Sequence, residues 1–426
     1  MIRTVVYQQK EELDLLLGKD FFERFAPGVK VDDLSSGLIK LITGPRRSGK
    51  SVFSLQLLKG RNFAYLNFDD DLLLKNFDEN KVIQVLSEAY PNHTHLLLDE
   101  VQNLPGWEMW VNKLYRRGVN LVITGSNARL LSKEMATVLT GRYLQIEMLP
   151  FSFAELMAFR KYDIKLTGEL TPLVTGDILQ NLADYMVYGG FPETVQARAI
   201  TKNYLSALFD SVLLKDITTR FHVRQPRVLY DLSHYLLTNY CNPFSFNQLK
   251  NDLELNSVAT VKKFCDYLAE PYLFFYLPRY STKLKIRQKS PKKLYVVDNG
   301  FIQARSFELF RNDGRLLENV VFVEMLRRNL KPGLELFYYR TRNDKEVDFV
   351  CRKGHQVTTL IQVCFDISDA KTLKREISAL LEAGNELSCD HFQILTWDRE
   401  TVLQEQNATI TVMPVWKWLL RKSVEV

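Results

Sequence analysis

The sequence 41-LITGPRRSGKSVF-53 decides how the first part of this chain is interpreted. It passes from an apolar segment through a glycine-rich basic loop into an amphipathic segment, and residues 44–51 match the pattern G-x-x-x-x-G-K-[ST] at every fixed position. Glycines at these places allow a tight turn in which successive backbone N–H groups point inward, and the helix that follows adds the positive end of its dipole. The stretch therefore predicts a loop that binds phosphates.

The residue types in this loop also predict its ligands, ATP and Mg²⁺. The ammonium of Lys50 can reach the β- and γ-phosphates, and the hydroxyl of Ser51 can bind Mg²⁺. A basic surface turn is the alternative, but the motif lies between an apolar strand and a helix, as a phosphate loop requires. The predicted nucleotide-binding residues are Gly44, Pro45, Arg46, Arg47, Ser48, Gly49, Lys50 and Ser51.

A second motif, 95-HLLLDE-100, has the pattern of a buried strand that ends in two carboxylates. We predict that Asp99 holds Mg²⁺ together with Ser51 and that Glu100 activates the attacking water. An acidic pair that only caps a loop, and nucleotide binding without hydrolysis, are the alternatives. Both motifs together predict a Mg²⁺-dependent ATPase more specifically than either does alone.

Further candidates follow the next strand pattern, "VITGSN". Ser126 or Asn127 could contact the γ-phosphate as a sensor, although a simple turn after a strand is the alternative. Arg142 in "LTGRY" is a candidate arginine finger, in cis or in trans, and a surface arginine without a role is equally compatible with the pattern. Arg129 and Arg47 are weaker candidates for the same task.

Composition limits the classes of protein that this chain can belong to. Five widely spaced cysteines without a C-x-x-C pair argue against a disulfide framework and a zinc ribbon, and favour a reducing compartment. No apolar run approaches the length of a membrane span, and the N-terminus lacks the apolar core of a signal peptide. The net charge of +6 permits a polyanionic partner without requiring one. We therefore expect a soluble cytoplasmic protein with no membrane partner.

Several further motifs extend along nearly the whole chain: "DEVQNLPGWE", "TGSNARLL", "LTGRY", "LPFSFAEL", "YGGFPE", "LLKDITTR", "YVVDNGF" and "KEVDFV". With them the chain resembles prokaryotic P-loop ATPases of the AAA-like and STAND-related branch, whose C-terminal domain of unknown function resembles restriction-endonuclease cores. The resemblance implies an ATPase domain, a helical lid, a winged helix and a nuclease-like module. It also implies that Gly190-Phe191-Pro192 lies near the adenine, although the same residues are an ordinary helix break.

The expected fold class is α/β, with a P-loop NTPase parallel sheet, a helical lid, a winged helix and a second α/β domain that is restriction-endonuclease-like. The predicted domains are an N-terminal helical segment (1–35), the P-loop ATPase core (36–155), the helical lid (156–225), the winged helix with a basic connector (226–290) and the restriction-endonuclease-like domain (291–426).

The segment 243-PFSFNQLKNDLELNSVATVKKFCDYLAEPYLFFYLPRY-280 has the pattern of a helix-turn-helix followed by a wing. Ser245 and Gln248 form a capping-box pattern at one helix, and Lys262 and Lys263 would face outward from the next. The connector 279–293 carries further cations and no acidic residue. DNA is one candidate partner for this surface, and an intramolecular or protein contact is the other.

The nuclease-like domain lacks parts of the site that metal-dependent cleavage needs. Glu318 and Asp348 supply two carboxylates, but the next strand reads "LIQVCFD" and places Gln362 and Cys364 where a Glu-x-Lys pair is required. Asp366 lies two residues too far along and is a poor substitute. We therefore predict a domain that has lost nuclease activity and serves in binding or packing.

Three functions remain compatible with these patterns. The first, which we favour, is an ATPase whose hydrolysis cycle acts as a switch on a protein or DNA partner, or through self-association into a homo-oligomer. The second is an ATP-gated DNA nuclease. The third is an interaction module that binds nucleotide without hydrolysing it.

Overall fold

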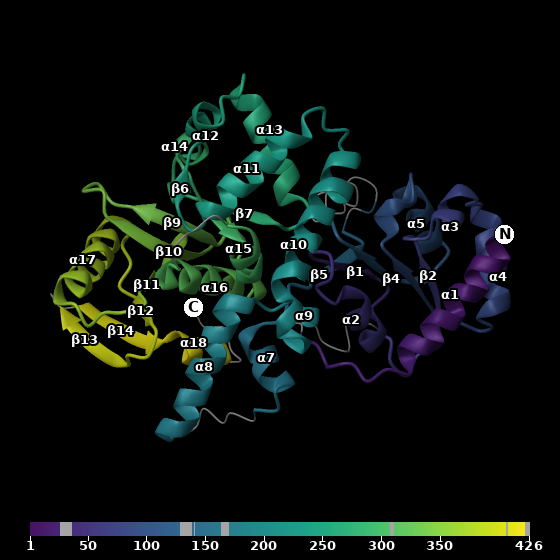
Figure 1. Ribbon diagram of the computed structural model, residues 1–426, viewed down its shortest axis with the longest axis horizontal. Helices are drawn as coiled ribbons and strands as arrows, with labels where there is room; N and C mark the ends of the chain where they lie inside the picture. Colours follow the sequence, from purple (N-terminus) through teal and green to yellow (C-terminus); the bar gives the residue numbers. More distant parts are fainter. Residues whose placement is uncertain are drawn as a thin grey trace. The chain divides into compact units, whose positions relative to one another are not determined.

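The structure is a computed structural model that describes residues 1–25, 36–127, 139, 141–162, 170–306, 311–405 and 408–421. Contacts along the chain divide it into two compact units (Figure 1). Unit 1 comprises Met1–Pro150 together with Glu270–Tyr272, and unit 2 comprises Phe151–Ala269 together with Leu273–Val426. The candidate Arg129 lies outside the described residues.

Unit 1 contains a parallel sheet with the strand order β2-β3-β4-β1-β5, and the prediction of an α/β chain with such a sheet is confirmed. Strands β1 and β3 are buried at every position, which explains why both read as continuous apolar runs. The elements of unit 1 are α1 (Ile2–Leu17), β1 (Ile39–Thr43), α2 (Lys50–Leu57), β2 (Phe63–Asn67), α3 (Asp71–Lys75), α4 (Glu79–Ala89), β3 (His95–Asp99), the 3₁₀ helix η2 (Val101–Asn103), α5 (Trp107–Arg116), β4 (Asn120–Gly125) and β5 (Tyr143–Glu147).

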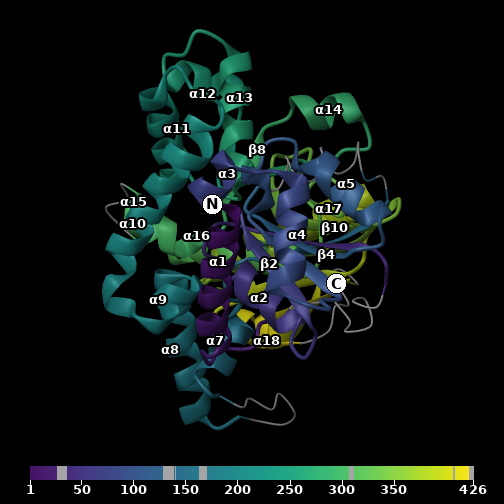
Figure 2. The same ribbon diagram turned by 90° about the vertical axis from the view of Figure 1, so that its right-hand side faces the viewer.

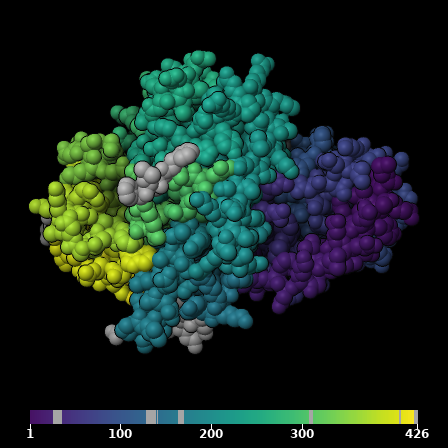
Figure 3. Space-filling model, viewed as in Figure 1, coloured from purple at the N-terminus to yellow at the C-terminus, as the bar shows by residue number. Residues whose placement is uncertain are grey.

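Helices around this sheet begin where side chains can cap them. Asp70 and Asp78 accept hydrogen bonds from the first turns of α3 and α4, which satisfies backbone N–H groups that have no partner within the helix. Helix α1 lies beside α4 in both ribbon views (Figures 1 and 2) and buries Val5, Val6 and Leu13. Its outer side forms part of the surface of unit 1, shown in purple in Figure 3.

The strand order brings three strand ends together. β4 lies between β1 and β3, and the register pairs Thr43 with Gly125 and Leu98 with Ile123. Because the strands are parallel, the residues that follow β1, β3 and β4 meet at one edge of the sheet. This edge carries the loop 44–51, the acidic pair and the sensor candidates.

Unit 2 begins with helices and a small antiparallel sheet of order β6-β8-β7. Its strand β8 begins with Lys292 and Lys293, the last two residues of the basic connector. The elements are α7 (Phe153–Phe159), α8 (Pro172–Tyr188), α9 (Pro192–Gln196), η3 (Arg198–Ile200), α10 (Thr201–Ser211), the π-helix η4 (Val212–Thr219), α11 (Pro226–Thr238), β6 (Pro243–Phe244), α12 (Phe246–Asp252), α13 (Val258–Ala269), β7 (Phe274–Pro278), α14 (Leu284–Lys289), β8 (Lys292–Val296) and α15 (Asn299–Arg305).

The rest of unit 2 forms a second, mixed sheet of order β13-β14-β12-β11-β10-β9. Helix α17 packs on β10 and β11, and α16 contacts β8 and β11. These elements are α16 (Asp313–Arg327), β9 (Leu336–Arg340), β10 (Glu346–Lys353), β11 (Gln356–Val363), α17 (Ala370–Leu387), β12 (Phe392–Thr396), β13 (Thr401–Glu405), β14 (Ala408–Pro414) and α18 (Val415–Leu420).

The motifs "YGGFPE" and "YVVDNGF" meet inside unit 2. The buried carboxylate of Asp298 accepts hydrogen bonds from the backbone N–H of Gly190 at 2.7 Å and of Gly300 at 2.8 Å. Burial raises the pKa of Asp298 to about 6, although both hydrogen bonds act in the opposite direction. Phe191 is fully buried against Phe301, with ring centroids 5.1 Å apart. Packing within unit 2 thus accounts for the glycines of the first motif.

Gly189→Ala, at the residue that follows α8, is expected to destabilise the chain, whereas Gly176→Ala within α8 is expected to stabilise it. A Cβ at position 189, where φ is +73°, would lie 1.7 Å from Asp298 Oδ1, and a Cβ at 176 would meet nothing within 4 Å. We expect a loss of about 1–3 kcal/mol for the first variant and a gain of about 0.5–1 kcal/mol for the second. Urea unfolding of both variants measures the difference, and equal midpoints would contradict this interpretation.

Candidate functional site

The loop between β1 and α2 has the backbone shape that its glycines predict. Gly44 has φ of +153°, and a Cβ there would lie 2.1 Å from the carbonyl oxygen of Met148. Gly49, at the start of α2, has φ of 92°. Arg47 also lies in the left-handed region, with φ of 64°. These positive φ values give the loop the tight curl that a phosphate-binding loop requires.

Lys50 lies inside this curl. Its side chain is 3% exposed, and Nζ donates to the carbonyl oxygen of Pro45 at 3.0 Å. The same Nζ is 3.4 Å from Glu100 Oε1. The two motifs recognised in the sequence are therefore in direct contact through an ion pair.

Ser51 and Asp99 also meet, as the shared metal-binding role requires. The Ser51 hydroxyl donates to Asp99 Oδ1 at 3.1 Å, and the Thr124 hydroxyl donates to the same oxygen. The phenol of Tyr65 donates to Asp99 Oδ2 at 3.3 Å. Burial raises the pKa of Asp99, and the charge of Glu100 adds to this effect. A buried carboxylate of this kind gains most from a bound cation, which would favour its ionised form.

Glu100 adopts an unusual backbone conformation immediately after β3, with φ of 51° and ψ of 42°. Its N–H donates to the Thr124 hydroxyl at 3.0 Å, and its carboxylate accepts a hydrogen bond from Gln102. Burial alone would raise the pKa of Glu100, but the Lys50 ammonium and the hydrogen bonds from Gln102 and Ser126 outweigh it, so the pKa is lowered. Glu100 is therefore ionised near neutral pH and can accept a proton.

The sensor candidates lie at the same edge. Ser126 is buried and its hydroxyl accepts a hydrogen bond from Gln102 at 3.3 Å. Asn127 is buried too, and its amide donates at 3.3 Å to Glu270, which belongs to the same unit. Arg46 forms an ion pair with Asp69 at 3.3 Å.

Arg142 lies at the opposite edge of the sheet from the loop 44–51. It directly precedes β5, which runs parallel to β1 with Tyr143 opposite Ile39. Arg142 therefore belongs to the edge where the strands begin. Five residues of strand, roughly 16 Å, separate that edge from the loop. The Arg142 guanidinium is 5.5 Å from the centre of the Tyr115 ring. The structure does not bring Arg142 to the loop of its own chain.

The sequence analysis missed four residues of this site: Tyr65, Thr124, Arg24 and Gln102, whose amide donates to Glu100 and Ser126. Tyr65 and Thr124 come from the strands on either side of β3 and hold Asp99. Arg24 is buried and donates to the carbonyl oxygens of Ser48 and, at 2.8 Å, of Leu149. Arg24 lies in the aromatic stretch 21-FFERF-25, outside every motif recognised in the sequence, whereas Thr124 precedes the glycine of "VITGSN" and could have been noted.

The described residues fit a nucleoside triphosphate and a divalent cation. The loop offers a glycine-dependent turn with a buried lysine beside it, and Ser48 Oγ is buried without a hydrogen-bond partner among the described residues. A hydroxyl and a carboxylate converge at Ser51 and Asp99, and hard oxygen ligands of this kind suit Mg²⁺.

Comparison with known proteins places this site within a family. Residues 36–157 match the model of an AAA domain, residues 179–308 match a domain of unknown function (DUF8612), and residues 313–418 match another (DUF4143). An uncharacterized protein of Methanocaldococcus jannaschii is 32% identical over 398 residues, which are 90% of this chain and 88% of that protein. The chain belongs to the same family as this archaeal protein.

A second member is an uncharacterized protein of Haemophilus influenzae, 32% identical over 78% of this chain and 83% of its own length. Among solved structures, the Walker-type ATPase PABY2304 of Pyrococcus abyssi is 14% identical, with a TM-score of 0.44 over 67% of this chain and 98% of its own. A likeness at this level carries no argument. The match to an AAA domain covers residues 36–157, the part of this chain that carries the G-x-x-x-x-G-K-[ST] loop and the acidic pair.

Among the helices in the described part of the chain, none is both long enough and apolar enough to cross a membrane.

Proposed function

We propose that this family member hydrolyses ATP with Mg²⁺ and uses the cycle as a switch on a protein or DNA partner. The observation that carries the proposal is the contact between the two motifs: Lys50 pairs with Glu100 at 3.4 Å while Ser51 donates to Asp99 at 3.1 Å. Positive charge, a metal-binding pair and an ionised base thus converge on one edge of the sheet.

Each residue has a distinct role in this proposal. Backbone N–H groups of residues 44–51 and the Lys50 ammonium hold the phosphates, and Ser51 and Asp99 hold Mg²⁺. Bound Mg²⁺ would neutralise charge that develops on the phosphate oxygens. Glu100 orients the attacking water and accepts its proton. Thr124 fixes both carboxylate residues, because its hydroxyl contacts Asp99 and the backbone of Glu100.

Ser126 and Asn127 complete the proposal as sensor candidates. Both lie where β4 ends, and Ser126 shares the Gln102 amide with Glu100. Arg142 can act as an arginine finger only in trans, since it belongs to the other edge of the sheet.

The proposed partner surface is the segment 243–296, which we interpret as a winged helix. Lys262 and Lys263 are exposed on α13. The ammonium groups of Lys262 and Lys292 lie 5.5 and 5.2 Å from the centre of the Phe246 ring, so cations from α13 and β8 converge on one aromatic side chain. Such a surface suits a phosphate backbone better than a neutral protein face.

The test is ATP turnover with and without duplex DNA, in Mg²⁺ and in EDTA. We expect turnover only with Mg²⁺, stimulation by DNA in the parent chain, and loss of that stimulation in Lys262→Glu/Lys263→Glu. Lys371→Glu/Lys374→Glu on α17 makes the same charge change elsewhere in unit 2 and should retain it. A rate that is unaffected by DNA and by protein concentration would eliminate the switch, and no turnover at all would favour a module that only binds nucleotide.

A further inference from the structure

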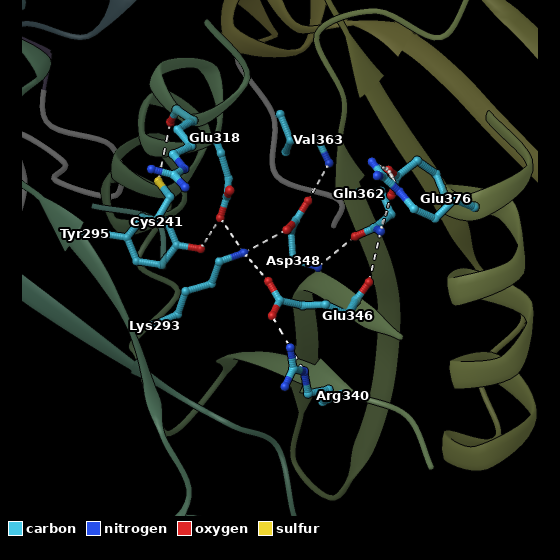
Figure 4. Close-up of polar contacts among 12 residues, drawn as sticks. Cys241, Lys293, Tyr295, Glu318, Arg340, Glu346, Asp348, Gln362, Val363 and Glu376 are labelled. Atoms are coloured by element: carbon cyan, nitrogen blue, oxygen red, sulfur yellow. Dashed lines mark hydrogen bonds and ion pairs between the residues drawn. The ribbon is translucent and has the colours of Figure 1, made fainter. Parts of the chain in front are cut away.

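Unit 2 contains a buried lysine surrounded by carboxylates, far along the sequence from the ATPase motifs. The side chain of Lys293, on β8, is 2% exposed. Its Nζ lies 2.8 Å from Glu318 Oε1, from Glu346 Oε1 and from Asp348 Oδ1 (Figure 4). An ammonium has three N–H donors, so three acceptors satisfy it completely.

The carboxylates are themselves held in place. Tyr295 donates to Glu318 Oε1 at 2.6 Å, and the backbone N–H of Val363 donates to the second oxygen of Asp348 at 2.9 Å. Figure 4 shows these side chains directed toward Lys293 from α16 and β10. Glu318 and Asp348 are therefore held by contacts other than those with Lys293.

Gln362 extends this arrangement away from the lysine. Its Oε1 accepts from the backbone N–H of Asp348 at 2.7 Å, and its Nε2 donates to the carbonyl oxygen of Glu346 at 3.1 Å and to the Glu376 carboxylate. A glutamate could not make the two donations, because an ionised carboxylate only accepts hydrogen bonds. The amide at this position thus belongs to the same network as the lysine.

The location matters because Glu318 and Asp348 are the residues that the sequence analysis assigned to a nuclease-like metal site. Mg²⁺ would need its oxygens at about 2.0–2.1 Å, whereas these oxygens are spaced around a nitrogen at 2.8 Å. No group of three or more His, Cys, Asp or Glu among the described residues could hold a metal ion. The centre of the carboxylates is occupied by Nζ.

We propose that Lys293 is the resident cation of this site: its ammonium replaces the divalent ion of a nuclease-like centre, excludes metal, and joins β8 to β10 and α16. Burial alone would lower the pKa of Lys293, but Asp348, Glu318 and Glu346 raise it well above its ordinary value, so the lysine keeps its charge. The C-terminal domain then works without metal chemistry.

The test compares the full parent chain with Lys293→Met, which removes the charge and leaves an unbranched side chain one atom shorter. Terbium luminescence, sensitised by nearby Tyr295, reports ion binding, and Mn²⁺ competes for the same site. We expect Lys293→Met to bind one more ion per chain than the parent does. The additional ion should no longer bind to the triple variant Lys293→Met/Glu318→Gln/Asp348→Asn. Lys345→Met removes a lysine paired with Glu382 in the same unit and should bind no additional ion.

Thermal unfolding gives an independent measurement if the variant is poorly stable. Removing the buried cation that contacts all three carboxylates should lower the midpoint by roughly 5–10 °C, and Mn²⁺ should restore several degrees. Two results would overturn the proposal. The first is an ion that binds to the parent chain and is lost in Glu318→Gln. The second is a Lys293→Met variant that, whether folded or unfolded, neither binds an additional ion nor is stabilised by Mn²⁺.

Discussion

Lys50→Ala is expected to reduce ATP turnover at least about 100-fold, since removing one preorganised charge at the transferring phosphoryl group costs this much or more. ATP binding should weaken as well, because the ammonium contacts the phosphates before and during the reaction. Phosphate release and binding of a fluorescent ATP analogue measure the two effects separately.

The structure adds a reason specific to this chain. Lys50 is buried against Glu100 and Pro45, so the alanine variant leaves the Glu100 carboxylate without its cation. Lys59→Ala, an exposed lysine two residues after α2, is the matched control and should behave like the parent. If Lys50→Ala bound ATP as tightly and turned it over as fast as the parent, the loop would not be a phosphate site.

Glu100→Gln is expected to abolish turnover while it retains ATP binding. The amide has the same size but cannot accept the proton of the attacking water, and loss of a general base typically costs about 10²–10⁴-fold in rate. Because the pKa of Glu100 is lowered, turnover of the parent should be insensitive to pH near neutrality and decline only in acid, where this carboxylate becomes protonated. Glu79→Gln, which alters an exposed pair with Lys113, is the matched control.

The two measurements distinguish the proposed roles. Tight ATP binding without turnover in Glu100→Gln would support its role as the base. Unchanged turnover would show that another group activates the water, and equal loss of binding in both variants would indicate that Glu100 serves mainly to position Lys50.

The sequence predicted the parts of the site that are contiguous. The loop and the acidic pair each follow a single strand, so spacing along the chain is enough to recognise them. Thr124 and Tyr65 could not be assigned in the same way, because their proximity to Asp99 depends on which strands flank β3. Arg142 shows the converse: its motif was noticed, but its distance from the loop depends on the direction of β5.

The C-terminal domain, for which the sequence predicts a nuclease-like fold, illustrates a similar limit. The substitutions at 362 and 364 were visible in the sequence and led to the prediction of an inactive domain. The cation that satisfies Glu318 and Asp348 was not, because Lys293 belongs to a strand of a different sheet and was counted as part of a basic connector. Lys293 differs from the other cations of the connector because its side chain is buried. Composition does not show which one of several neighbouring cations is buried.

The amide of Gln362 limits which single replacements this domain can tolerate. A glutamate at that position would place a negative charge beside Glu376 and beside the carbonyl oxygen of Glu346, where the amide nitrogen now donates. Gln362→Glu alone would therefore weaken the fold without creating a metal ligand. An acid at this position would become tolerable only after Glu376 had also been replaced, so the two positions are coupled through a single amide nitrogen.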